Sequence, residues 1–406
     1  MSLKAFLKSK AKDLLMNKLY KLFLKLVSKL IPIKKGTILF ESHEDFSEGT
    51  YRLFEYMKNG TDNKTWWYIS KENRNKAKTL GVKKFIIADG NFFYKYVIKP
   101  LKYYRMNYVL FTHRFPGFSI EKQGQFCLFF DHGQPFKYVP AFQKQIPSFS
   151  YRLTNNHFTG SLLMEKYKIP EEKLIFSMNP RVLPLLYSDK VKTKKTLKIN
   201  KESKVLVCLP TWNRKLYLEE DLYIDFPIRV TKDDLIKLNI CLKEHNCFLI
   251  FKFHPMVKNR KMEQDEFSNI IVLNNKQILS KGIDVYDLLS CSDCLITDFS
   301  SIFIDYYLLD KPVIFLGGNY DAEKKNQPNE DGGFVFDNYM DYLCGPICFN
   351  FDDLYLEILN VLKGKDGFKS EREKVSALYN CYVSSNLCIE LENKIKESLN
   401  KQKAGK

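Results

Sequence analysis

The sequence of 406 residues lacks the signatures of several large classes of protein. It contains no run of about 18 uncharged apolar residues, which excludes a membrane-spanning helix. It also contains no G-x-G-x-x-G fingerprint, Walker A motif, H-E-x-x-H or G-x-S-x-G. No group of His, Cys, Asp and Glu has the spacing of a metal site, so we expect neither a metal ion nor a required cofactor.

The ten cysteines are scattered, and residues 1–30 show no apolar core or small-residue cleavage site of a secretory signal. We therefore expect a reducing cytosol and no disulfide framework. Cys291 and Cys294 have the spacing of half a metal or redox site. They lie inside the apolar run Leu288–Ile296, with no second pair at a zinc-like distance, so we interpret them as buried structural thiols.

Positive charge is in excess, with 64 Lys and Arg against 47 Asp and Glu and a net charge of +17. Such an excess suits nucleic acid, an anionic membrane or a phosphorylated substrate. Residues 1–30 hold eight Lys and one acid, Asp13, and so supply +7 of the total. Because no nucleic-acid motif accompanies this charge, we expect no nucleic-acid partner.

The same N-terminal residues alternate leucine with lysine at helical spacing until Pro32 ends the pattern. This predicts a basic amphipathic helix within residues 1–35. Residues 1–30 could lie in the interface of an anionic membrane, with Leu and Phe inward and Lys toward the headgroups. The alternative is a helix that packs on the protein's own surface and exposes its lysines to water.

Beyond residue 35, short apolar runs alternate with helical patterns, which is typical of parallel sheets covered on both faces. The alternation pauses in a basic stretch and then restarts. The sequence therefore predicts an α/β fold of GT-B type, with two Rossmann-like domains facing a cleft. The expected boundaries are 36–182 for the first domain, 183–203 for a linker and 204–400 for the second domain.

Ligands of such sheets bind at the carboxyl ends of the strands, so the residues after each expected strand are the candidates for a site. After the apolar run ending at Phe130 comes Asp131-His132-Gly133, followed by Lys137. His132 is a candidate general base, Asp131 could orient it, Gly133 permits close approach of a ligand, and Lys137 could meet a phosphate. The alternative is a structural histidine in a turn.

A second candidate follows the run that ends at Phe253. Lys252 and His254 alternate along the strand and so share one face, and Pro255 turns the chain out of the sheet. Two such groups at a strand tip suit a phosphate, although His254 could also be a satisfied surface histidine.

The third candidate is the strand end Thr297-Asp298, followed by Ser300 and Ser301 at the start of a helix. Free backbone N–H groups at a helix start favour an anion, and the two hydroxyls add donors. The alternative is ordinary N-capping, for which one serine is enough.

Further short motifs connect these candidates along the chain. In sequence order they are His132-Gly133-Gln134-Pro135-Phe136-Lys137, Pro180-Arg181, Pro210-Thr211-Trp212 with Arg214, His254-Pro255, Asp284-x-x-Asp287-Leu288-Leu289, Ser292-Asp293, Thr297-Asp298-Phe299-Ser300-Ser301, Phe303-x-Asp305-Tyr306, Lys311-Pro312-Val313-Ile314-Phe315, Gly333-Phe334-Val335-Phe336-Asp337 and Gly345-Pro346. Over roughly residues 36–395 this series resembles the CDP-glycerol glycerophosphotransferase family, which builds glycerol-phosphate or ribitol-phosphate units of teichoic acids and capsules. Gln134 stands where that family has Thr, and Gly332 stands where it usually has Arg.

The resemblance implies a GT-B enzyme that transfers glycerol phosphate or ribitol phosphate from CDP-glycerol or CDP-ribitol to a hydroxyl of a lipid-linked or polymeric glycan, with release of CMP. It also implies a peripheral location at the cytoplasmic face of the plasma membrane. In this interpretation His132 is the base on the acceptor hydroxyl, with Gly133 and Lys137 on the acceptor side. His254 stabilises the departing phosphate. The expected donor-binding residues are Ser300, Ser301, Thr297, Asp298, Lys252, Arg214, Asp284 and Asp305.

Two other functions fit part of the sequence. A GT-B glycosyltransferase that uses a nucleotide sugar would share the fold and the phosphate-binding features. A non-catalytic binder of membranes or nucleic acid would use only the basic charge.

Overall fold

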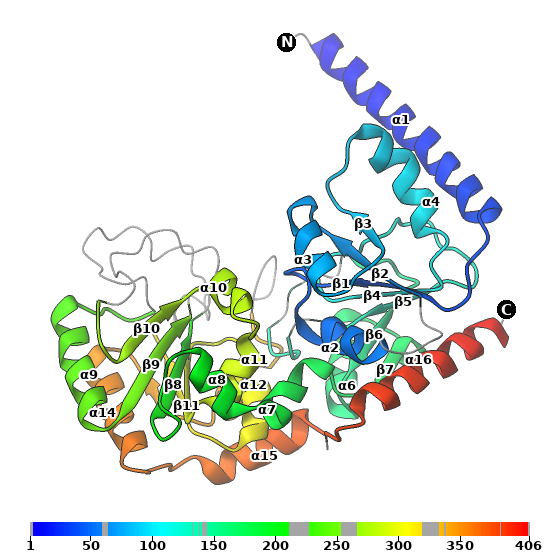
Figure 1. Cartoon of the computed structure of the whole chain (residues 1–406). Coiled ribbons are helices and arrows are strands. Elements are labelled where there is room, and N and C mark those ends of the chain that lie inside the picture. The colour runs from blue at the N-terminus through cyan, green and yellow to red at the C-terminus, as the bar shows by residue number, and fades with distance from the viewer. Residues whose placement is uncertain are drawn as a thin grey trace.

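The computed structural model describes residues 3–58, 64–131, 133–137, 139, 144–210, 227–252, 266–318, 333–336, 338–381 and 383–404, with backbone alone for 3–16 and 403–404. Two α/β domains lie side by side, each built on one parallel sheet (Figure 1). The predicted GT-B type of fold is confirmed.

The first domain contains a seven-stranded parallel sheet in the order β3-β2-β1-β4-β5-β6-β7. Its strands are β1 (Thr37–Glu41), β2 (Lys64–Ile69), β3 (Phe85–Ile87), β4 (Tyr108–Phe111), β5 (Phe126–Phe129), β6 (Tyr151–Thr154) and β7 (Leu174–Phe176). The strand order reverses between β1 and β4, which pair in parallel, so the loops after these two strands diverge and leave a crevice between them.

The second domain repeats this topology in six strands, in the order β10-β9-β8-β11-β12-β13. They are β8 (Lys204–Leu209), β9 (Cys247–Lys252), β10 (Ile270–Leu273), β11 (Cys294–Thr297), β12 (Val313–Leu316) and β13 (Ile347–Cys348). Here the order reverses between β8 and β11. The central strands are unbroken apolar runs because helices bury both faces of each sheet.

Helices connect the strands and cover the sheets (Figure 1). The α-helices are α1 (Leu3–Leu30), α2 (Glu48–Met57), α3 (Arg74–Thr79), α4 (Lys99–Tyr103), α6 (His157–Tyr167), α7 (Leu183–Tyr187), α8 (Lys190–Thr196), α9 (Lys232–Glu244), α10 (Asn275–Ser280), α11 (Val285–Cys291), α12 (Ile302–Tyr306), α14 (Phe351–Leu362), α15 (Lys369–Tyr379) and α16 (Leu387–Ala404). Single helical turns η1 (Lys71–Asn73), η3 (Glu171–Lys173), η4 (Pro180–Val182), η6 (Tyr307–Leu309) and η7 (Tyr339–Tyr342), and a π-helical turn η2 (Tyr94–Ile98), complete the connections.

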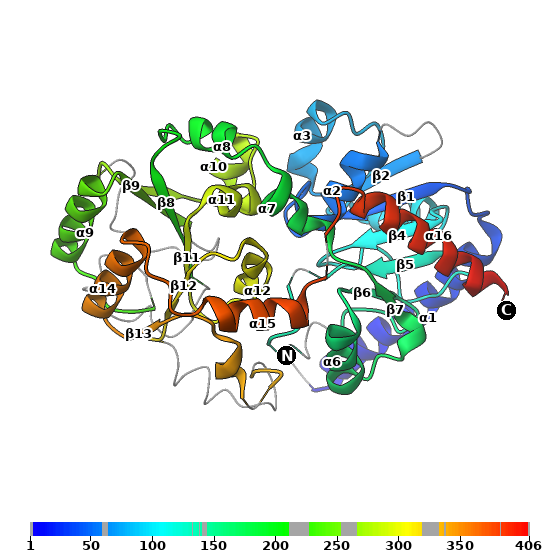
Figure 2. The same ribbon diagram turned by 90° about the horizontal axis from the view of Figure 1, so that it is seen from below.

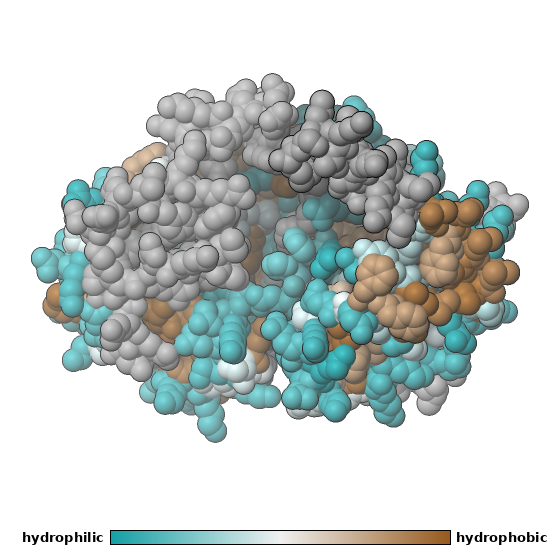
Figure 3. All heavy atoms as spheres, turned by 90° about the horizontal axis from the view of Figure 1, so that it is seen from above, coloured by the Kyte–Doolittle hydropathy of each residue, from teal (hydrophilic) through white to brown (hydrophobic). Residues whose placement is uncertain are grey.

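The N-terminal helix α1 has two apolar faces along its described side chains. Leu24 and Val27 are buried against the first domain, together with the half-buried Tyr20 and Phe23. A second row of leucines, exposed by 52% to 76%, faces away from the domain and consists of Leu19, Leu22, Leu26 and Leu30. Figure 3 shows apolar side chains gathered over this part of α1. Among the described helices, none is long and apolar enough to cross a bilayer.

The chain crosses between the domains twice, and the two crossings lie together (Figure 2). The expected linker 183–203 forms α7 and α8. The second crossing lies between α15 and α16, where the hydroxyl of Tyr187 donates a hydrogen bond to the carbonyl of Val383 at 3.0 Å. Helix α16 packs in the core of the first domain through Leu391 and Ile395, although the expected second domain extended to residue 400.

All ten cysteines are free thiols, and nine of them are buried. Cys291 and Cys294 are among the buried nine, on α11 and β11, so their interpretation as structural thiols is confirmed. Burial raises the pKa of the Cys291 thiol to about 11. A thiol held protonated in this way is a poor nucleophile and a poor metal ligand.

Candidate active site

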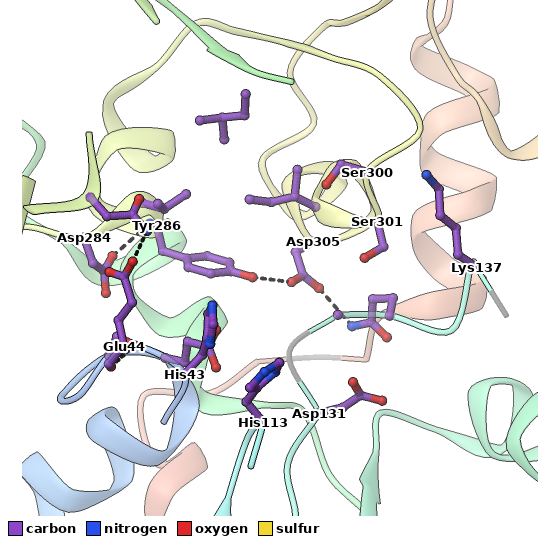
Figure 4. Close-up of a pocket in the computed structure, with 18 of the residues that line it drawn as sticks. His43, Glu44, His113, Asp131, Lys137, Asp284, Tyr286, Ser300, Ser301 and Asp305 are labelled. Atoms are coloured by element: carbon purple, nitrogen blue, oxygen red, sulfur yellow. Dashed lines mark hydrogen bonds between the residues drawn. The ribbon is translucent and has the colours of Figure 1, made fainter. Parts of the chain in front are cut away.

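A cavity of about 550 Å³ lies between the two domains, where the carboxyl ends of both sheets meet. Its first-domain wall comes from the loops after β1, β4 and β5, and its second-domain wall from β8, β9, α11 and the start of α12. Eight expected site residues line this cavity: Asp131, Gly133, Lys137, Lys252, Asp284, Ser300, Ser301 and Asp305 (Figure 4). The structure thus brings together segments that are more than 160 residues apart in the sequence.

The loop after β5 is held in an unusual conformation next to the cavity. Asp131 has a left-handed backbone, with φ of 60°, which costs a non-glycine residue free energy. Its carboxylate pairs with the buried Arg152, and its carbonyl accepts hydrogen bonds from Asn179 Nδ2 at 3.3 Å and Arg181 Nη1 at 3.4 Å. These contacts fix the backbone on the N-terminal side of His132, which itself lies outside the described residues.

Gly133 brings this loop against the second domain. A Cβ atom at position 133 would lie 2.6 Å from Ser301 Oγ, closer than real Cβ contacts allow. Ser301 occupies the N-cap position of α12 but makes no capping hydrogen bond through its side chain. The capping alternative therefore does not describe Ser301, and its hydroxyl faces the cavity together with that of Ser300 (Figure 4).

Asp305 joins the two domains beneath the cavity. Its carboxylate accepts hydrogen bonds from Arg181 Nε at 2.8 Å, Tyr286 Oη at 2.7 Å and Gln134 Nε2 at 2.9 Å. The side chains of Arg181 and Asp305 are each only 2% exposed. A buried carboxylate with three donors already in place is well suited to hold the shape of the site.

Asp284 also has structural partners. Its Oδ1 caps α11 by accepting the backbone N–H groups of Tyr286 and Asp287 at 2.8 and 3.0 Å. Its Oδ2 pairs with Arg52 of α2 at 2.5 Å, so this contact bridges the domains. Burial raises the pKa of Asp284, against the opposing effect of the Arg52 charge.

Lys252 is the last residue of β9 and brings a positive charge to the wall of the cavity. Burial lowers the pKa of its ammonium to about 8, while the negative charge of Glu44 acts in the opposite direction. Glu44 comes from the loop after β1 and accepts a hydrogen bond from Asn275 Nδ2 of the second domain. Lys252 is therefore a partly buried cation with a carboxylate nearby, in a cavity wide enough for an anionic ligand.

The remaining expected donor-binding residues lie away from the cavity or outside the described part of the chain. The hydroxyl of Thr297 donates to the carbonyl of Leu209 at 2.8 Å, so it ties β11 to β8. Thr297 and Asp298 are buried and do not line the cavity. His254 and Arg214 lie outside the described residues.

The cavity also contains residues that the sequence analysis missed. His43 follows β1 and His113 follows β4, and their ring centroids lie 4.3 Å apart. Beneath them Glu41 is 3% exposed and accepts the backbone N–H groups of Thr112, His113 and Arg114 at 3.0 to 3.2 Å. Both histidines stand two residues after the end of a strand. They could therefore have been predicted, because ligands bind at the carboxyl ends of the strands in such sheets.

Two doubly wound domains around a cavity at the crevices of both sheets define a GT-B-like architecture. The chain matches the family described as CDP-Glycerol:Poly(glycerophosphate) glycerophosphotransferase over residues 22–392. It belongs to this family, and the resemblance inferred from the motifs is confirmed.

Curated relatives carry names from teichoic acid synthesis. The teichoic acid glycerol-phosphate transferase of Staphylococcus aureus is 25% identical over 382 residues, which cover 85% of this chain and 88% of that protein. The teichoic acid poly(glycerol phosphate) polymerase of Staphylococcus epidermidis is 24% identical over 87% of this chain. This chain spans about half of the polymerase, since the match covers 49% of its length.

Solved structures show the same fold. A variant of the wall teichoic acid polymerase TagF matches with a TM-score of 0.72 and 20% identity, over 99% of both chains. The UDP-GlcNAc 2-epimerase of Neisseria meningitidis matches with a TM-score of 0.52 and 12% identity, over 89% of this chain and all of the epimerase. At these identities the likeness concerns the fold alone.

Proposed function

We propose that this protein transfers glycerol phosphate from CDP-glycerol to a hydroxyl of a lipid-linked or polymeric acceptor. The observation that carries the proposal is the family match over residues 22–392, combined with a cavity at the place where both sheets expose their strand ends. The acceptor oxygen attacks the β-phosphorus and forms a new O–P bond. The bond from that phosphorus to the bridging oxygen breaks, CMP leaves, and the hydroxyl proton passes to a base.

The described residues supply charge neutralisation and hydroxyl donors for this reaction. Lys252, Ser300 and Ser301 are the proposed contacts of the donor pyrophosphate, because they line the second-domain wall. Phosphoryl transfer requires mainly positioning and electrostatic stabilisation, and a partly buried cation serves both. On the family motif alone we assign the base to His132 and stabilisation of the leaving group to His254. Arg214 is a candidate contact of the donor phosphates, although Asn213 precedes it where the family has Arg.

The test is CMP release by the purified full chain from CDP-glycerol, CDP-ribitol and a panel of nucleotide sugars. A short glycerol-phosphate oligomer serves as acceptor. We expect release from CDP-glycerol and a loss of about 10²–10⁴-fold in rate in His132→Ala, with donor binding retained. His245→Ala is the matched control, because His245 ends α9 and does not line the cavity. Release from a nucleotide sugar alone would overturn the proposal, and release from CDP-ribitol alone would change the donor.

We also propose that α1 places the enzyme on an anionic membrane. The support is the row of exposed leucines, Leu19, Leu22, Leu26 and Leu30, on a helix that also carries Lys18, Lys21, Lys25 and Lys29. Apolar side chains can enter the acyl boundary while lysines meet acidic headgroups. A neighbouring face of α1 is already packed on the first domain, so the membrane and the active site would have a defined relative orientation.

Sedimentation with vesicles of phosphatidylglycerol and phosphatidylcholine tests this placement. We expect the wild-type protein to sediment with the anionic vesicles and the double variant Leu22→Glu/Leu26→Glu to stay in solution. Ile240→Glu is the matched control, because Ile240 is 53% exposed on α9 of the other domain, close to the 52% of Leu26. Equal sedimentation of the leucine variant and the wild type would contradict this role of α1.

A further inference from the structure

The first-domain wall of the cavity contains a cluster that the proposed donor contacts do not use. His43 and His113 come from the two strands between which the strand order reverses, and their planes are tilted by 49° at a centroid distance of 4.3 Å. Both rings face the cavity in Figure 4, on the side opposite Ser300 and Ser301. A ligand on the second-domain wall would therefore leave this crevice for a second molecule.

The loops that carry the two histidines are held by hydrogen bonds from neighbouring side chains. The buried carboxylate of Glu41 accepts three backbone N–H groups of residues 112–114, which fixes the loop of His113. Ser42 Oγ accepts the N–H of Ser47 at 3.2 Å and donates to the carbonyl of Glu44 at 2.7 Å, which fixes the loop of His43. Backbone ordered in this way holds side chains where a ligand can use them.

The third member of the cluster is Glu48, whose carboxylate oxygen Oε2 is buried and has no hydrogen-bond partner among the described residues. Glu48 lines the same cavity and has a left-handed backbone, with φ of 61°. It lies close enough to Tyr286 and Glu41 for its charge to raise the pKa of both, although burial is the larger cause in each case. A buried acceptor without a donor is costly unless a ligand supplies one.

We propose that His43, His113 and Glu48 form the acceptor subsite and bind a polyol phosphodiester end. The imidazoles bind the phosphate, because an imidazole ring offers N–H donors to phosphate oxygens. Glu48 accepts a hydrogen bond from a hydroxyl of the terminal polyol. This inference rests on the proposed transfer reaction and names the part of the cavity that recognises the acceptor.

Equilibrium binding of a fluorescent glycerol-phosphate oligomer to the full chain, without donor, tests the subsite independently of turnover. We expect His43→Gln and His113→Gln each to weaken binding by about tenfold or more. His245→Gln is the matched control and should bind as the wild type does. The dissociation constant of CDP-glycerol should stay within about threefold of the wild-type value in all three variants, which shows that each is folded.

A second oligomer, with its terminal hydroxyls methylated, tests separately whether Glu48 accepts a hydrogen bond from a terminal hydroxyl. The wild-type protein should prefer the free end, and Glu48→Met should lose this preference. Wild-type protein that fails to bind the oligomer, or histidine variants that bind it normally, would overturn the subsite. Failure of the proposed transfer is a separate result, because it is read from CMP release and not from acceptor binding.

Discussion

Gly133 of the first domain and Ser301 of the second touch so closely that a side chain at 133 has no room. The nearest atom to a Cβ added at this position would be Ser301 Oγ at 2.6 Å, whereas Ser301 Cβ would lie at 3.8 Å, an ordinary contact distance. The hydroxyl of Ser301 is thus the obstacle, and the glycine is needed for the approach of two backbones and not for a left-handed turn.

Gly133→Ala should therefore separate the loop from α12 or push Ser301 out of its rotamer. We expect a loss of about 1–3 kcal/mol in the free energy of unfolding, measured by chemical denaturation. Adding Ser301→Ala removes the obstructing oxygen and should restore most of the loss. Equal destabilisation in the single and double variants would show that the contact is not the cause.

Arg181→Met should be one of the most destabilising changes in the chain. It leaves the carboxylate of Asp305 buried, with Tyr286 and Gln134 as its remaining donors, at an expected cost of about 3–5 kcal/mol. The ion pair of Lys396 and Glu392 on α16 provides the comparison, because the Lys396 side chain is 54% exposed, and Lys396→Met should change stability by less than about 1 kcal/mol. Similar losses in the two variants would contradict a special role for the buried pair.

Donor affinity should fall as the pH rises from 7 to 9. Burial lowers the pKa of Lys252 to about 8, so its charged fraction drops from about nine tenths to about one tenth over this range. Calorimetry with CDP should show weaker binding at pH 9, and Lys252→Arg should flatten the dependence because arginine stays charged. An unchanged pH profile in Lys252→Arg would place the titrating group elsewhere.

The free energy of unfolding should also depend on pH through the protonation of Glu41. Burial raises the pKa of its carboxyl to about 7 from 4.5, although three backbone N–H groups act in the opposite direction. The folded state then holds a proton that the unfolded chain has released, so stability is full below about pH 4.5 and falls as the pH rises to about 7. The loss amounts to about 3 kcal/mol.

Glu41→Gln has no such proton and should remove this part of the pH dependence. The measurement is the free energy of unfolding of both proteins at about pH 5 and about pH 8, on either side of the raised pKa. A wild-type curve with the same slope as the variant would show that Glu41 is ionised throughout.

The strands of the two sheets were predictable where they are apolar and central. The short apolar runs beyond residue 35 predict ten strands, and each corresponds to an observed strand. The runs are Thr37–Phe40, Thr65–Ile69, Lys84–Ile87, Tyr108–Thr112, Phe126–Phe130, Val205–Leu209, Cys247–Phe253, Ile270–Leu273, Cys294–Thr297 and Val313–Leu316. The missed strands are β6, β7 and β13. In β6 the charge of Arg152 hides a buried strand, because its partner Asp131 comes from a distant loop. The other two have only three and two residues, too few to show a period.

Part of the candidate site was predictable from strand ends and motifs. Ser300, Ser301 and Lys252 face the cavity as expected. Thr297 belongs to the same motif, yet its hydroxyl already donates to Leu209, on a strand more than 80 residues earlier. Local sequence shows which residues stand at a strand end, and the fold decides which of them point at a ligand.

The paired crossings near Tyr187 and Val383 have a mechanical consequence. Because the chain passes between the domains twice at one place, the two crossings together define a single hinge line. A rotation about this line moves the hinge little and the far rim of the cleft most. The contacts of Arg52 with Asp284, of Glu44 with Asn275 and of Arg181 with Asp305 join the two domains and would oppose such a rotation.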